Sequence, residues 1–235
     1  MKRGSFLLML LLFIVAKVSS QETIQKRSLE VVSNIQTFKS TVLLDSNNKM
    51  EPVCRHLMPC YTDFKYATTN NFTGKVLYQN PEAYLRLPAA KALANVNREL
   101  MQKGYLIKVY DAYRPYDVTV TMWQVVPDER YTANPTKGSG HNRGAAVDVT
   151  LVDLITGQEA VMPTAYDDFS EKAHHSFKEL PKEAIANREL LKNTMVKHGF
   201  EVFETEWWHY SWPGMTEKFA VLNLTFQQLG ELAME

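Results

Sequence analysis

A glycine-rich stretch in the middle of the chain constrains its function most strongly: Gly138-Ser-Gly-His-Asn-Arg-Gly-Ala-Ala-Val-Asp148. It places His141 seven residues before Asp148, and a second cluster, Glu206-Trp-Trp-His209, follows about sixty residues later. Two imidazoles and one carboxylate are the three protein ligands that a catalytic zinc ion requires, with its fourth position left open. Glu206 is then free to act as a general base on water. The two clusters therefore predict one zinc ion per chain, held by His141, Asp148 and His209.

Each of these residues also has a purely structural interpretation. His141 lies beside glycines and could be an ordinary loop histidine, while Trp207 and Trp208 are more typical of packing than of chemistry. Asp148 could be held by backbone donors, but a carboxylate among apolar residues is costly unless it is paired or bound to a metal. Glu206 and His209 are three residues apart and would face opposite sides of a regular strand, so a bend or bulge is needed there.

The first twenty residues have the pattern of a secretory signal peptide. Lys2 and Arg3 precede an apolar run over residues 6–16, which is too short to span a bilayer comfortably, and small residues precede a cleavage site after Ser20. We therefore expect a signal peptide over residues 1–20, a mature domain over residues 21–235, and export, with the periplasm as the expected location. An uncleaved signal anchor is the alternative.

Charge argues against a nucleic-acid partner. Removal of residues 1–20 takes away Lys2, Arg3 and Lys17 and no acidic residue, so the formal net charge changes from 0 to −3. No membrane partner is expected after signal cleavage, and the sequence gives no indication of the oligomeric state. In an oxidising compartment, Cys54 and Cys60 are predicted to form a local disulfide. Metal binding by these cysteines with His56 is the weaker alternative.

Patterning predicts one α+β domain in which helices flank a mainly antiparallel central sheet. Residues 21–60 have no clear period and are expected to wrap the domain as an extended arm. The predicted strands cover residues 63–68, 105–110, 145–152, 200–203 and 207–210, and the predicted helices cover residues 88–103, 115–123 and 185–195, with a short last helix capped by Thr225 and Gln228.

Asp111 and Arg114 follow directly after the predicted strand over residues 105–110. Arg114 could be a surface ion-pair partner, but a fixed guanidinium also suits a developing oxyanion, and Asp111 would orient it.

Several segments together resemble the D-alanyl-D-alanine dipeptidases of the VanX type. The two metal-site motifs, residues 139–148 and 206–210, look like those of the family, and further similar segments follow in the same order: residues 63–68, 111–115 and 162–175. The similarity covers roughly residues 60–212. It implies the compact α+β fold of zinc D,D-peptidases, which is also hedgehog-like.

The resemblance implies a role for each matching residue. His141, Asp148 and His209 would bind zinc, Glu206 would be the catalytic base, and Arg114 would stabilise the tetrahedral intermediate. It adds Asp167 and Ser139 as contacts to the dipeptide substrate.

The implied reaction is hydrolysis of D-Ala-D-Ala to D-alanine, in cell-wall dipeptide turnover more than in vancomycin resistance. A D,D- or L,D-carboxypeptidase acting on peptidoglycan stem peptides is the alternative. A non-catalytic wall-binding module is a further one, against which Glu206 argues, because a structural metal site needs no base.

Overall fold

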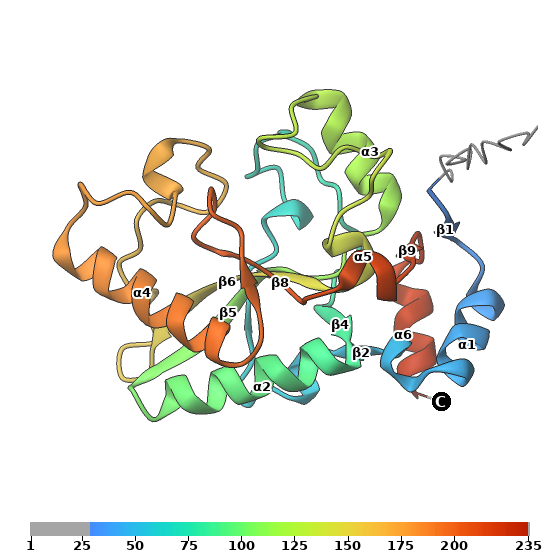
Figure 1. Cartoon of the computed structure of the whole chain (residues 1–235), viewed down its shortest axis with the longest axis horizontal. Helices are drawn as coiled ribbons and strands as arrows, with labels where there is room; N and C mark the ends of the chain where they lie inside the picture. Colours follow the sequence, from blue (N-terminus) through green and yellow to red (C-terminus); the bar gives the residue numbers. More distant parts are fainter. Residues whose placement is uncertain (1–28, 235) are drawn as a thin grey trace, which may run out of the picture.

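The computed structural model describes residues 29–234, which form an α+β arrangement of helices around a central sheet (Figure 1). The predicted signal peptide, residues 1–20, lies outside the described residues. Among those residues, no helix has the length and apolar character needed to cross a membrane.

The helices are α1 (Ile35–Leu44), α2 (Leu87–Met101), α3 (Tyr116–Val125), α4 (Lys182–Lys197), α5 (Met215–Lys218) and α6 (Phe226–Met234). The strands are β1 (Val31–Val32), β2 (Met50–Pro52), β3 (Tyr61–Thr62), β4 (Tyr84–Arg86), β5 (Tyr105–Asp111), β6 (Ala146–Asp153), β7 (Glu201–Val202), β8 (His209–Ser211) and β9 (Val221–Leu222).

The central sheet has five strands in the order β3-β5-β6-β8-β7. Only the β3–β5 pair is parallel, and the other three pairs are antiparallel. The prediction of an α+β fold with a mainly antiparallel sheet is therefore confirmed. Two small two-stranded sheets, β2–β4 and β1–β9, lie beside it.

Strand alternation in β6 separates the core from the site. Val147, Val149 and Leu151 are fully buried in a core cluster that also contains residues of α2 and α4. Asp148 points to the opposite face, because successive side chains alternate across a sheet. α2 and α4 thus cover one face, and the loops around α3 lie on the other side (Figure 1).

α2 forms where the periodicity predicts a helix. Leu93, Val96 and Leu100 lie on one buried face, and Pro88 occupies the first turn, where its missing N–H leaves no partner unsatisfied. Asn97, also on this face, accepts a 2.9 Å hydrogen bond from the backbone N–H of Ile107 in β5. The helix is thereby fixed to the strand that leads to Asp111.

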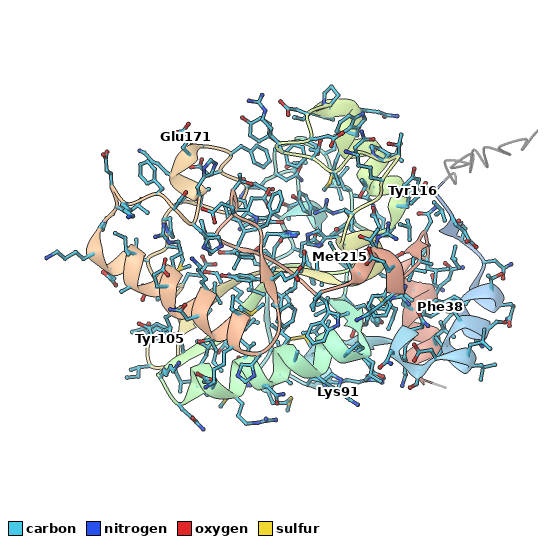
Figure 2. All side chains as sticks on the ribbon, viewed as in Figure 1. Phe38, Lys91, Tyr105, Tyr116, Glu171 and Met215 are labelled. Atoms are coloured by element: carbon cyan, nitrogen blue, oxygen red, sulfur yellow. A yellow bond between two sulfur atoms is a disulfide. The ribbon has the colours of Figure 1, made fainter. Side chains whose placement is uncertain are left out.

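The prediction of an extended arm over residues 21–60 is wrong for its described part, which contains α1. Asn34 caps this helix, because its side chain accepts hydrogen bonds from the backbone N–H groups of Gln36 and Thr37. Phe38, labelled in Figure 2, is the buried residue of α1 and belongs to a core cluster with Leu229 of α6. Contacts with the distant C-terminal helix therefore stabilise a segment that has little helical periodicity of its own.

The predicted strand over residues 63–68 is also wrong. β3 ends at Thr62, and Lys65–Ala67 form a 3₁₀ turn. An ion pair between Lys65 and Asp63, 2.7 Å long, closes this turn on its outer side. On its inner side Tyr66 is buried and packs its ring edge-on against Tyr78. Burial of this aromatic ring outweighs the local preference for a strand.

One local link and one long-range link connect segments around the central sheet. Cys54 and Cys60 are joined by a disulfide. Arg86 is buried between the rings of Phe38 and Phe219, and its guanidinium donates hydrogen bonds to the backbone carbonyls of Asn48, Arg143 and Ala220. This one side chain holds the loop after His141 against the segment before β2 and the segment before β9.

The last helix begins with the predicted capping box. The backbone N–H of Gln228 donates to the Thr225 hydroxyl, and the backbone N–H of Thr225 donates to the Gln228 side chain. α6 therefore starts where the sequence predicts.

Candidate metal and catalytic site

Asp148 and His209 lie directly opposite each other on the antiparallel strands β6 and β8. Their neighbours in the same register, Val147 and Tyr210, point into the core, so Asp148 and His209 point to the other face. Asp148 Oδ1 lies 2.9 Å from His209 Nδ1. The alternation of two paired strands thus brings these two predicted ligands together.

His141 reaches the same point from the loop before β6. It begins a 3₁₀ turn, His141–Arg143, that Gly144 ends in the left-handed conformation, with φ +65°. His141 Nε2 lies 3.4 Å from Asp148 Oδ1 and 3.2 Å from His209 Nδ1. A side chain at Gly140 would lie 2.8 Å from Ala146, so glycine lets the loop approach β6 this closely.

The three ligand atoms fit a zinc ion by their mutual distances. In a tetrahedral site with bonds of about 2.0–2.1 Å, two ligand atoms are about 3.3 Å apart. The corresponding separations here are 2.9, 3.2 and 3.4 Å, and the three residues form a group whose possible ligand atoms all lie within 4.8 Å.

Supporting hydrogen bonds orient each ligand. His141 Nδ1 lies 2.7 Å from the carbonyl of Ala112, so Nδ1 carries the proton and Nε2 is free for a metal. His209 Nε2 contacts the Ser211 hydroxyl at 3.1 Å, which leaves its Nδ1 for the metal. Tyr166 donates a 2.8 Å hydrogen bond to Asp148 Oδ2, the oxygen that faces away from the histidines.

The charges of this cluster favour an ionised Asp148. Burial, the largest influence, favours the neutral acid, but the charges and hydrogen bonds of His141 and His209 outweigh it and lower the pKa of Asp148. For His141, burial is the largest influence and opposes protonation, but the charges of Asp148 and Asp111 and the hydrogen bond with Asp148 together outweigh it and raise the pKa. The site therefore attracts positive charge, as a cation-binding site should.

Glu206 lies in the turn before β8, which starts only at His209. The backbone N–H of His209 donates to the carbonyl of Glu206, and this turn aims both side chains inward. The predicted strand over residues 207–210 therefore starts two residues too early, and the predicted bend is present. Glu206 Oε2 lies 4.0 Å from His209 Nδ1, and burial raises the pKa of Glu206 to about 7. A carboxyl group with that pKa can both accept and return a proton near neutral pH.

Arg114 is fixed by Asp111, as predicted. Its Nε and a terminal nitrogen donate to Asp111 Oδ2 at 3.1 and 2.7 Å, and its guanidinium lies 5.2 Å from the ring centre of Tyr66. Asp111 also accepts a 2.7 Å hydrogen bond from Tyr78. An irregularity in the register of β5, between Val109 and Asp111, redirects the end of this strand toward the site.

Asn142 joins three parts of the site and was not predicted. Its side-chain amide donates to the carbonyl of Arg114 at 2.9 Å and to the hydroxyl of Thr119 in α3 at 2.8 Å. Its side-chain oxygen accepts from the backbone N–H of Ser139, and its own N–H donates to the Ser139 hydroxyl. A single asparagine between two motif residues carries no local signal of this role.

A cavity of about 230 Å³ adjoins the three candidate ligands. The other predicted site residues that line it are Ser139, Glu206, Arg114 and Asp167. Asp111 lies behind Arg114, and the Cys54–Cys60 disulfide is not part of the lining.

Asp167 closes one side of this cavity. Tyr66 donates to both of its carboxylate oxygens, at 3.1 and 2.9 Å, and burial raises the pKa of Asp167 to about 7. Its backbone is left-handed, with φ +61°. Two supporting tyrosines were not predicted, because their partners are distant in the sequence. Tyr66 lies 101 residues from its partner Asp167. Tyr166 lies 18 residues from its partner Asp148.

Comparisons with known proteins agree with this geometry. A family model described as D-ala-D-ala dipeptidase, of peptidase family M15, matches residues 47–228. D-alanyl-D-alanine dipeptidase of Escherichia coli (strain K12) is 37% identical over 151 residues, which cover 64% of this chain and 78% of the relative. The dipeptidase of Streptomyces coelicolor is 33% identical over 173 residues (63% and 84%), and that of Enterococcus faecium is 31% identical over 168 residues (63% and 83%).

The family match extends from β2 to α6 and includes every strand of the central sheet as well as every residue that lines the cavity. With well over half of the chain matched, this protein belongs to the D-ala-D-ala dipeptidase family of metallopeptidases.

Proposed function

We propose that this chain hydrolyses the free dipeptide D-alanyl-D-alanine to D-alanine with one zinc ion held by His141, Asp148 and His209. The observation that carries the proposal is that these three residues, Glu206 and Arg114 converge on one small cavity. The names of the relatives supply the substrate class. Zinc, when bound, supplies a Lewis acid that acidifies water and polarises a peptide carbonyl.

Glu206 is the proton carrier of the proposed reaction. It is close to His209 but is not needed as a ligand, and its side chain lines the site cavity, where it can take a proton from the attacking water. It then returns that proton to the leaving amine.

Arg114 stabilises the negative charge that develops on the carbonyl oxygen. Its ion pair with Asp111 and its stacking over Tyr66 hold the guanidinium in place before substrate arrives. A charge fixed in advance stabilises a transition state without reorganisation.

Asp167 binds the free ammonium group of the dipeptide, and Ser139 contacts the substrate from the ligand loop. A charge-assisted contact of this kind is stronger than a neutral hydrogen bond. An N-acylated peptide leaves the Asp167 carboxylate without that partner, so Asp167 selects for a free amino terminus.

We further propose that residues 1–20 direct export to the periplasm, where the enzyme would act on dipeptides released in cell-wall turnover. The basic start and short apolar run of this segment support the proposal.

Release of D-alanine from D-Ala-D-Ala and from a stem pentapeptide tests the proposed activity. The purified zinc-loaded chain should release D-alanine from the dipeptide far faster than from the pentapeptide. Preferential cleavage of the pentapeptide would replace this proposal with the carboxypeptidase alternative, and no release from either would support a binding module.

A further inference from the structure

A second cavity of about 730 Å³ adjoins the candidate active site. Its lining contains polar side chains such as Lys65, Asn70 and Glu159, and aromatic ones such as Tyr110 and Trp207. Among residues 29–234, Phe72 and Asp167 alone line both this outer cavity and the site cavity. These two residues therefore form the partition between the two spaces.

The backbone that carries Phe72 is held in place by its neighbour. The Asn71 side chain donates to the carbonyls of Thr68 and Lys75 at 2.7 and 2.8 Å and accepts from the backbone N–H of Thr73 at 2.9 Å. Both ends of this loop are thus hydrogen-bonded to the side-chain amide of Asn71. The position of the Phe72 ring is set by this loop and by its packing.

The Phe72 ring packs between two other aromatic rings. It lies edge-on to Phe169, at a centroid distance of 5.6 Å, and edge-on to Tyr66, at 6.2 Å. Phe169 packs in turn against Tyr131, at 4.9 Å. Tyr66 also donates a hydrogen bond to Asp167, so both residues of the partition contact Tyr66.

A peptide whose amino group contacts Asp167 ends at this partition. Any further residue on that amino group would have to enter the outer cavity, and the Phe72 ring and the Asp167 side chain stand in the way. The polar and aromatic lining of the outer cavity is of the kind that binds peptide groups. The space for a longer substrate exists beside the site but is separated from it.

We propose that Phe72 is a specificity-determining residue that restricts the site to dipeptides by separating it from the outer cavity. This inference rests on the proposed dipeptidase function. We expect truncation of the ring to connect the two cavities, while every candidate metal ligand, Glu206 and Arg114 are unaltered in sequence. The substrates gained are peptides or acyl-dipeptides extended at the amino terminus.

The test compares D-Ala-D-Ala with N-acetyl-D-Ala-D-Ala in the unmutated chain and in Phe72→Ala. Asp167 remains in both proteins, so its loss of an ammonium partner affects them equally, and a change in selectivity reports on the ring. We expect the ratio of kcat/KM for the free dipeptide over the acetylated one to fall by about tenfold or more, mainly through faster cleavage of the acetylated substrate.

Phe64→Ala is the matched control. Phe64, like Phe72, is a half-buried ring packed against the same core cluster, but it lines neither cavity, so the selectivity ratio should stay unchanged. An equal fall in both variants would mean general loosening and would overturn the role of Phe72.

Phe72→Leu replaces the ring with a smaller aliphatic side chain and loses less packing, and it is compared in the same way if Phe72→Ala does not fold. A Phe72 variant that still cleaves D-Ala-D-Ala with an unchanged ratio overturns this inference alone. Absence of D-Ala-D-Ala cleavage by the unmutated zinc-loaded chain overturns the proposed function instead.

Discussion

Asp148 and His209 are cross-strand partners, and Asp148 Oδ1 lies 2.9 Å from His209 Nδ1. Because the two residues belong to adjacent strands of the central sheet, their separation is fixed by backbone pairing. Only His141 of the candidate ligands comes from a loop, and it is anchored by its contact with the carbonyl of Ala112. A metal site built in this way is largely formed before the ion binds.

Replacement of Glu206 separates metal binding from catalysis. Glu206→Ala should keep its zinc, because Glu206 is not one of the three candidate ligands, yet lose about 10²- to 10⁴-fold in kcat, the usual contribution of general acid–base catalysis. Metal analysis of the dialysed protein and a D-alanine release assay measure the two effects. His141→Ala is the comparison, and it should lose both zinc and activity. Loss of zinc from Glu206→Ala would contradict the assignment of Glu206 as a base.

Replacement of Asp167 should weaken selection for a free amino group. In Asp167→Asn, cleavage of D-Ala-D-Ala should slow on the order of 10²-fold, because the ammonium group loses a buried charged partner, while cleavage of N-acetyl-D-Ala-D-Ala changes less. Asp168→Asn is the matched control, since Asp168 lines neither cavity. Equal slowing of both substrates would show that Asp167 does not recognise the ammonium group.

Asn142 is expected to position the site without binding metal. Asn142→Ala leaves the carbonyl of Arg114, the hydroxyl of Thr119 and the half-buried N–H of Ser139 without this partner, so we expect a loss of about 1–3 kcal/mol in the free energy of unfolding and a lower kcat/KM with zinc retained. Asn187→Ala is the control, because Asn187 is also buried and donates to the carbonyl of Val161 but is not part of the site lining. Similar losses of activity in both variants would refute a specific role for Asn142.

The lowered pKa of His175 predicts that the folded protein loses stability in acid. Burial lowers its pKa from 6.5 to about 4, and the charge of Lys192 adds to this effect. As pH falls below 6.5 the unfolded chain binds a proton at this residue, whereas the folded protein does not until about pH 4. The free energy of unfolding should therefore decline between these pH values, by about 3 kcal/mol from this group. Denaturant titrations of the unmutated chain and of His175→Gln should show a smaller decline in the variant, and identical pH dependences would rule out this origin.

The disulfide should have a modest effect on stability. Cys54 and Cys60 close a short loop, and the loop-entropy model assigns at most about 3 kcal/mol to a loop of this size. Mass spectrometry of the unreduced protein should show the linked peptide. Thermal unfolding with and without reductant measures its contribution, and two alkylatable thiols in protein from an oxidising compartment would contradict the pairing.

The sequence predicted those parts of the fold and site that follow from local patterns. Alternation in β6 correctly placed Asp148 on the face opposite Val147 and Val149, and the odd spacing of Glu206 and His209 correctly required a bend. α1 was missed because its stability comes from contacts such as that of Phe38 with the C-terminal cluster, although the cap at Asn34 was a readable signal.

The supporting residues of the site could not be predicted in the same way. Tyr66 lies in a turn that local propensity assigned to a strand, and its partner Asp167 is far away in the chain. The partition at Phe72 likewise depends on the relative placement of loops that have no periodic pattern. Packing between distant segments decides these features, and no spacing in the sequence encodes it.

Arg86 connects the loop after His141 to two segments that are distant from it in the sequence. Its guanidinium takes carbonyl partners from Asn48 near the start, from Arg143 in the loop after His141, and from Ala220 near the end. If either terminal segment detached, a buried positive charge would lose acceptors, which is strongly unfavourable. We therefore expect the segments around Asn48 and Ala220 and the loop after His141 to lose their structure together.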